Sequence, residues 1–142
     1  MGRLTRFAAN ARRGRLQKTL SATAAASAVP LAFEVYIEHY RGSFGDRWEW
    51  APLVCTPPMV AAGVAGVFSE RAARTALPAA ASLYALNGIV GSVLHARGVQ
   101  RKPGGFREPG YNLVMGPPLL APGSFTLVGA IGMLAALVGR ER

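Results

Sequence analysis

Two histidines, His39 and His95, are the side chains whose type and placement best suit cofactor chemistry, and the sequence contains no further histidine. Each stands near the end of a long apolar segment, and the topology argued below places both at the same membrane surface. Two histidines on neighbouring helices can ligate one b-type haem inside a helical bundle. Helix-end histidines are equally ordinary polar groups of a membrane surface, so haem b is one of two open interpretations.

A pair of carboxylates comes next, in the stretch FEVYIEHYRG at residues 33–42. At 100° per residue, Glu34, Glu38 and Arg41 share one side of a helix. Glu38 and Arg41 fit an ion pair at the helix end, but Glu34 lies roughly 6 Å deeper by helical rise. An intramembrane carboxylate normally faces a partner or a water-filled cavity. Glu34 is therefore expected either to pair structurally or to carry protons. The sequence has neither HExxH nor a cysteine pair, so no metal site is predicted.

A third group of residues forms a stripe along one apolar segment. Its members fall within an arc of about 100° on a 3.6-residue helix, and they are Tyr84, Asn87, Gly88, Gly91 and His95. The glycines allow either another helix or a flat ligand to approach closely, and the polar side chains supply contacts. Helix packing and cofactor binding by Tyr84 and Asn87 are both compatible with this pattern.

Four apolar blocks must position these residues. Apolar residues make up 51% of the 142-residue chain and charged residues 16%, well below the roughly 25% of soluble proteins. A bilayer crossing needs about 20 apolar residues, which predicts spans at about 20–40, 51–69, 76–94 and 113–138. The predicted fold is an all-α bundle of four transmembrane helices in one domain (residues 20–142), preceded by a basic arm (residues 1–19).

The charges predict the orientation of this bundle. The net charge is +9, and ten basic residues fall on the side of the arm, the 70–75 turn and the C-terminus, against six on the other. Cytoplasmic loops carry the excess of Lys and Arg, so both termini are expected on the cytoplasmic side of a bacterial inner membrane. Anionic lipid headgroups account for the charges, and nucleic-acid binding is not predicted. The opposite face carries an aromatic belt: Tyr36, Tyr40, Phe44, Trp48, Trp50, Phe106 and Tyr111.

Partner contacts are expected at that outer, periplasmic face, because its two loops are the longer ones. The segment GYNLVMGPPLLAPG, at 110–123, holds three prolines and three of the glycines and is predicted to enter the membrane as irregular backbone. Such backbone must be buried in protein or line a cavity, which suits a quinone-sized pocket or a docked subunit. Pro117, Pro118, Trp48 and Trp50 are the expected contact residues.

One resemblance to a known family concerns AFEV at 32–35. It resembles the surroundings of the functional glutamate in the first span of small multidrug-type transporters, which are four-helix proteins. The longer outer loops and the biased charges of this chain depart from that family.

The sequence contains no GxSxG, P-loop, dinucleotide fingerprint or catalytic triad. We therefore expect a non-catalytic integral subunit of a larger membrane complex, related to electron transfer through His39, His95 and the covered cavity. A proton-coupled transporter using Glu34 is the alternative, as is a haem b- or quinone-binding membrane anchor. An enzyme acting alone ranks below these.

Overall fold

The computed structural model describes residues 2, 5, 9 and 15–138, and helices dominate this part of the chain. The order is α2 (Arg15–Arg41), the short 3₁₀ helix η1 (Arg47–Trp50), α3 (Ala51–Phe68), α4 (Glu70–Arg74), α5 (Ala76–Gln100), η2 (Gly105–Arg107), α6 (Pro109–Val114) and α7 (Ala121–Leu137). The all-α prediction is confirmed for the described residues, which contain no strand.

Three of the helical stretches are long and apolar enough to cross a membrane: Arg15–Arg41, Arg47–Phe68 and Glu70–Gln100. The fourth apolar helix, α7, has 17 residues and is about 25 Å long at 1.5 Å per residue. A bilayer core is about 30 Å thick. The chain is thus compatible with a multi-pass helical membrane protein.

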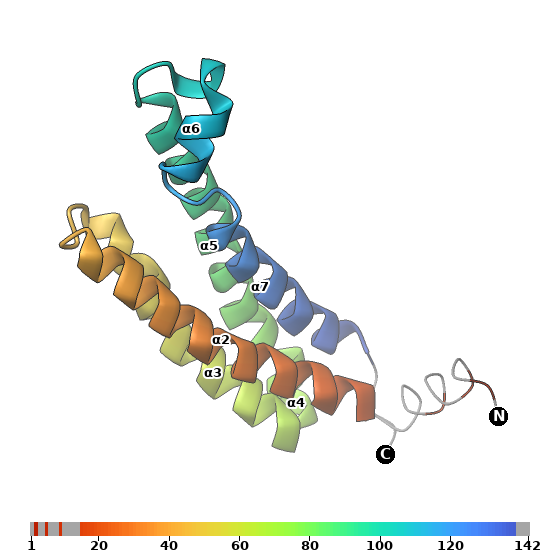
Figure 1. Cartoon of the computed structure of the whole chain (residues 1–142). Helices are drawn as coiled ribbons and strands as arrows, with labels where there is room; N and C mark the ends of the chain where they lie inside the picture. The colour runs from red at the N-terminus through yellow and green to blue at the C-terminus, as the bar shows by residue number, and fades with distance from the viewer. Residues whose placement is uncertain (1, 3–4, 6–8, 10–14, 139–142) are drawn as a thin grey trace.

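The four main helices form a closed ring in which α2 contacts α3, α3 contacts α5, α5 contacts α7 and α7 contacts α2. The tightest associations are α2 with α3 and α5 with α7. The two pairs lie together at the end that carries α4 and diverge toward the opposite end, where α6 lies beyond the start of α7 (Figure 1). We call these two ends the α4 end and the α6 end.

Small residues allow close approach within each pair, as the sequence predicts. A β-carbon at Gly129 of α7 would lie 2.5 Å from the carbonyl oxygen of Ala81 on α5. One at Gly63 of α3 would lie 2.8 Å from the Ala25 β-carbon on α2. Real β-carbons do not approach other atoms so closely, so the helices touch almost backbone to backbone.

The helix ends differ from the predicted spans in places. Helix α2 begins at Arg15, so the last residues of the basic arm are helical, and α5 continues to Gln100. The rest of the arm lies mostly outside the described residues, as does the C-terminal Arg140 to Arg142. The turn between spans two and three forms the short helix α4, because Ser69 caps it and Glu70 pairs with Arg74 at 3.0 Å.

The predicted fourth span, 113–138, is interrupted near its start, where its prolines and glycines predicted irregular backbone. Residues 109–114 form the helix α6, although we expected irregular backbone from residue 110 onward. The chain leaves helical geometry at 115–120 and resumes with Pro122 in the first turn of α7. Proline is well suited to a first turn, where no helical partner exists for its missing N–H. Proline and glycine therefore end α6 and start α7.

Candidate functional site

His39 lies at the α6 end of α2 and joins that helix to the turn that follows. Its Nδ1 is 2.9 Å from the Glu49 carbonyl oxygen. A carbonyl can only accept, so Nδ1 donates and the neutral ring keeps Nε2 as an acceptor. The imidazole edge also packs on the Phe44 ring, with centroids 6.1 Å apart.

Phe44 is the centre of an aromatic cluster at this end of the α2–α3 pair. Its ring stacks on Trp50 with centroids 4.1 Å apart and contacts Tyr36 at 5.8 Å. Both Ser43 and Phe44 have positive φ, 60° and 48°, a conformation that bulky residues seldom adopt. The stacking holds this strained turn in place. Trp48 and Trp50 remain about half exposed.

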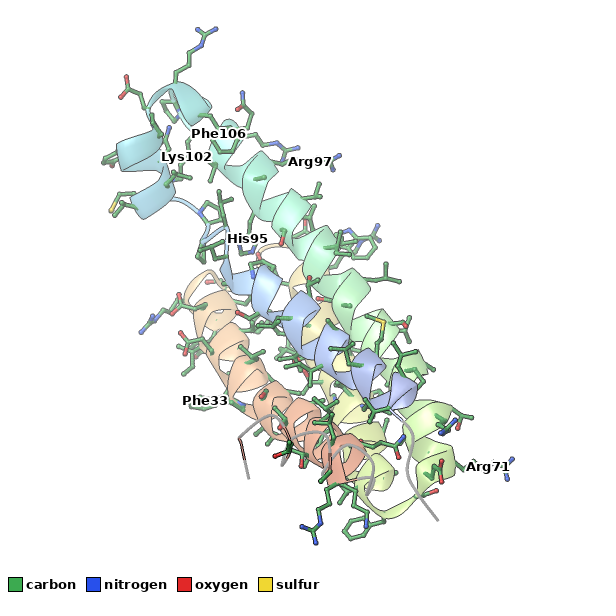
Figure 2. All side chains as sticks on the ribbon, turned by 90° about the vertical axis from the view of Figure 1, so that its right-hand side faces the viewer. Phe33, Arg71, His95, Arg97, Lys102 and Phe106 are labelled. Atoms are coloured by element: carbon green, nitrogen blue, oxygen red, sulfur yellow. The ribbon has the colours of Figure 1, made fainter. Side chains whose placement is uncertain are left out.

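His95, on α5, plays a corresponding part in the other helix pair. Its Nδ1 donates to the Pro118 carbonyl at 2.8 Å. Beside it, a β-carbon at Gly98 would lie 2.8 Å from the Pro117 ring. The non-helical link before α7 is therefore docked on α5 (His95 is labelled in Figure 2). Pro117 and Pro118 thus have an internal role, and their predicted contact with a partner stays a prediction.

The two histidines belong to different helix pairs, and in the described part of the chain no hydrogen bond or ring contact joins them. Their helices, α2 and α5, occupy opposite corners of the ring, and the pairs diverge toward the end where both histidines lie (Figure 1). Across residues 15–138 no three His, Cys, Asp or Glu side chains come together as metal ligands. A haem shared by His39 and His95 stays a prediction.

The stripe on α5 faces α7. A β-carbon at Gly88 would lie 2.5 Å from the backbone nitrogen of Thr126, and Thr126 Oγ1 donates to the Ala85 carbonyl at 3.3 Å. Tyr84 is fully buried against Phe125, with ring centroids 4.7 Å apart. Helix α7 therefore occupies the space in front of the glycines, which favours the packing interpretation.

Asn87 points toward α3 rather than α7. Its amide nitrogen lies 4.0 Å from the Cys55 sulfur, a long contact with a weak acceptor. Asn87 is partly buried, whereas Tyr84 is fully buried. No ligand role for either residue follows from these contacts, and their cofactor binding stays a prediction.

Glu34 is exposed on the outside of α2, with no hydrogen bond or ion pair to the described residues. Its neighbour Phe33, labelled in Figure 2, is 66% exposed. The expected pair of Glu38 with Arg41 is confirmed at 2.5 Å, so Arg41 is engaged elsewhere. Glu34 thus projects away from the bundle, toward whatever surrounds it.

The exposed side of α2 is made mostly of small or polar residues. Between residues 19 and 34, at 100° per residue, one arc of about 120° holds seven exposed positions: Thr19, Ala22, Thr23, Ala26, Pro30, Phe33 and Glu34. We call these seven the α2 outward face. The exposed side of α5 is quite different, since it presents Leu83, Leu86, Ile89, Val90 and Val93.

Two buried amides were not identified from the sequence. Gln17 of α2 donates to the carbonyls of Ala135 and Val138 at 3.0 and 2.9 Å, which serves groups left unpaired at the end of α7. Asn112 donates to the Pro103 and Gly105 carbonyls at 2.9 and 2.7 Å. Of the two, only Asn112 had a signal in the sequence, as a single amide close to glycine and proline residues that favour turns.

Comparisons of the chain with protein-family models, curated protein sequences and solved structures give no significant match. Its function is therefore inferred from its own side chains.

Proposed function

We propose that the chain is a small, non-catalytic integral subunit of a larger bacterial membrane complex, bound through the α2 outward face and the outer ends of its helices. The observation that carries this proposal is the exposure of Glu34 without a partner on the outside of the bundle. A monomer surrounded by lipid would direct this carboxylate into hydrocarbon.

The energetics support a protein neighbour. A charged side chain costs about 2.5–3.5 kcal/mol at the centre of a membrane helix even on insertion scales and less toward its ends, and such residues normally face protein or water. Small residues favour close contact between membrane helices, and Ala22, Thr23 and Ala26 supply them on the same face of α2 as Glu34. Lipid contact suits the α5 face instead, because its exposed residues are branched and apolar.

The aromatic cluster extends this surface to the outer end of the same helix pair. Trp48 and Trp50 are 55% and 48% exposed, and Tyr40 is 67% exposed. Aromatic rings anchor proteins in headgroups and also dominate protein interfaces. A partner that covers the α2 outward face would meet these rings where α2 ends.

The proposal includes a four-span bundle in the inner membrane with both termini cytoplasmic. The start of α2 and the end of α7 lie at the α4 end (Figure 1), which favours this count, with the 115–120 link completing the last crossing. A topology reporter fused after Arg142 should read cytoplasmic, and one inserted near Gly104 should read periplasmic. Both reporters on one side would contradict the four-span arrangement.

An electron-transfer role is the more specific part of the proposal. Metal-bound histidines usually donate their second ring N–H to a carbonyl or carboxylate, and His39 and His95 both do so. Each could supply one axial ligand to a haem b, or a polar contact to a quinone, held with a partner. The absorption spectrum of the intact complex tests this. A Soret band that persists in both His39→Ala and His95→Ala would exclude these histidines as ligands.

Crosslinking tests the subunit assignment directly. A photoreactive amino acid at position 26, on the α2 outward face, should crosslink to a different membrane protein identifiable by mass spectrometry. The matched control is position 89 on the exposed side of α5, which should react with lipid. Equal protein crosslinking at both positions, or none at position 26, would contradict the proposal.

The alternative function is a proton-coupled transporter. The unpartnered Glu34 also favours it, because a second copy packed on the α2 outward face would bring two such carboxylates together. In that case the crosslinked product at position 26 is a homodimer, and a pure homodimer survives gentle detergent extraction.

A further inference from the structure

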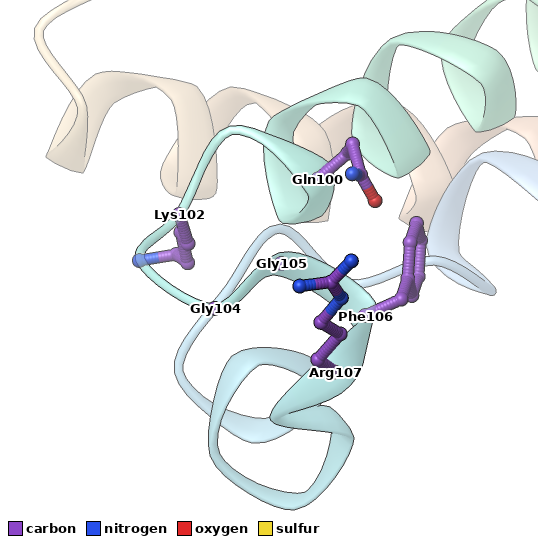
Figure 3. Close-up of a pocket in the computed structure, with 6 residues that line it drawn as sticks. All are labelled: Gln100, Lys102, Gly104, Gly105, Phe106 and Arg107. Carbon is purple, nitrogen blue, oxygen red and sulfur yellow. The ribbon is translucent and has the colours of Figure 1, made fainter.

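The loop between α5 and α6 forms an open pocket of about 460 Å³ lined by Gln100, Lys102, Gly104, Gly105, Phe106 and Arg107. Ligand pockets commonly measure about 300–1,000 Å³, so this one is large enough for a small polar headgroup. Figure 3 shows Lys102 at one side and Arg107 beside Phe106 and Gln100 at the other, with the two glycines between.

The pocket is held in shape by its own backbone. Gly104 and Gly105 have φ of 78° and 49°, which glycine adopts without strain. The buried Asn112 amide fixes the carbonyls of Pro103 and Gly105 from behind. Gly105 N also donates to the Lys102 carbonyl at 2.8 Å and Arg107 N to the Gly104 carbonyl at 2.9 Å. The backbone from which the lining side chains project is therefore fixed before any ligand arrives.

The charge around this pocket is strongly positive. Residues 96–114 contain four cations, Arg97, Arg101, Lys102 and Arg107, and a single acid, Glu108. In the described part of the chain none of these cations forms an ion pair. Arginine presents a planar fork of donors that matches phosphate oxygens, and lysine adds a point charge. An anion with several acceptor oxygens would be held by both ends of the pocket.

The position of the pocket indicates which anion this is. About 20 residues of α5 cross the hydrocarbon core, so a helix that enters at Ala76 leaves near His95 and carries the loop to headgroup level. Phe106 is 45% exposed in the pocket, and Val114 and Met115 at the end of α6 are 79% and 60% exposed. Cationic and apolar surface thus adjoin at the membrane boundary.

We infer that this pocket binds the phosphate of an anionic lipid headgroup, with Lys102 and Arg107 as its charged ligands and Gln100 as a neutral donor. The inference does not require a partner subunit. Lipid binding can therefore fail while the proposed function holds, and the proposed function can fail while lipid binding holds.

Native mass spectrometry of the full chain in detergent tests the inference. The probes are dioleoyl-phosphatidylglycerol and, as the zwitterionic lipid of equal chain length whose phosphate charge is offset by a choline cation, dioleoyl-phosphatidylcholine. We expect phosphatidylglycerol to bind at least tenfold more tightly. The double variant Lys102→Gln with Arg107→Gln should lose this preference, because charge-assisted hydrogen bonds each contribute about tenfold or more.

Arg71→Gln is the matched control, since it removes an exposed cation at the opposite end of the bundle (Figure 2); it should change binding by less than twofold. Arg107→Lys preserves the charge and should retain most of the preference, which separates lost charge from a misfolded loop. Equal binding of both lipids, or an equal loss in Arg71→Gln, would overturn the inference. If inorganic phosphate displaces the lipid at equal concentration, the pocket binds free phosphate as well as it binds the lipid, and the assignment of a lipid as the ligand would be overturned.

Discussion

The two helix pairs present different surfaces to their surroundings. The α2–α3 pair shows small and polar residues along α2 and an aromatic cluster at its outer end. The α5–α7 pair shows branched apolar residues along α5 and, from the last turn of α5 through the loop, four cations that form no ion pair with the described residues. The apolar side of the α5–α7 pair can face lipid directly, whereas the α2–α3 pair leaves the Glu34 carboxylate exposed. In the proposed function, the first pair contacts a partner protein and the second contacts lipid.

The pairs differ inside as well. In α5–α7, added β-carbons at Gly88 and Gly129 would lie 2.5 Å from backbone atoms, whereas at Gly63 in α2–α3 the nearest backbone atom, the Ser21 carbonyl oxygen, would lie at 2.9 Å. The closer clash with backbone requires the larger movement of a whole helix. The α5–α7 pair should therefore be the less tolerant of added volume.

The largest effect is expected for Gly129→Ala, which places a methyl group against the backbone of Ala81 and Ala85. Overpacking of this kind costs about 1–3 kcal/mol, and we expect the upper end of that range in detergent unfolding measurements. Gly123→Ala in the same helix is the control, since nothing lies within 4 Å, and it should be neutral or stabilising. A larger loss for Gly63→Ala than for Gly129→Ala would reverse the comparison of the pairs.

A smaller effect is expected for Ala26→Trp on the α2 outward face. The bulky ring should lower recovery of the co-purified partner at least tenfold, about 1.4 kcal/mol, by obstructing close helix contact. The melting temperature of the isolated chain should not change, because Ala26 is exposed. Leu86→Trp on α5 should leave recovery unaltered. Equal losses for the two variants would mean that the outward faces do not differ in function.

Asn112→Ala should destabilise only the loop of the α5–α7 pair. It removes two hydrogen bonds from a side chain that is 1% exposed, at about 1 kcal/mol each. Faster hydrogen exchange across residues 103–107, with unchanged exchange in α2 and α3, is the expected result. Asn87→Ala should matter less, because its contact with the Cys55 sulfur is long at 4.0 Å. Uniform acceleration over the whole chain would show that the loop is not an independent unit.

The smallest effect is expected for Glu34→Gln. The amide keeps most of the hydrogen bonding, so partner recovery should change by less than about fivefold, below 1 kcal/mol. A transporter would behave differently, because glutamine cannot exchange a proton. Loss of transport activity in a folded homodimer of this variant would favour the alternative function.

Much of the architecture could be predicted from the sequence. Block length and apolar composition identified α2, α3 and α5, because a helix that crosses a bilayer must bury about 20 residues in hydrocarbon whatever its neighbours are. The Glu38–Arg41 pair was also predictable, since residues three apart are neighbours on any helix. The break in the fourth span at 115–120 was predictable from the prolines and glycines there, whereas the short helix α6 before it was not.

Local pattern could not determine which side of each helix faces inward. In a helix that is apolar or alanine-rich all round, hydropathy singles out no face, so the exposure of Glu34 could not be read from its neighbours. It depends on the rotation of α2 about its axis, which is fixed by distant contacts such as Gly63 with Ala25 and Gln17 with Ala135. The same holds for the loop pocket, where Asn112 reaches back to Pro103 and Gly105. The sequence by itself determined where the long apolar helices α2, α3 and α5 lie, because this depends on local composition; only the tertiary structure decided which side chains meet, because that depends on how the helices pack.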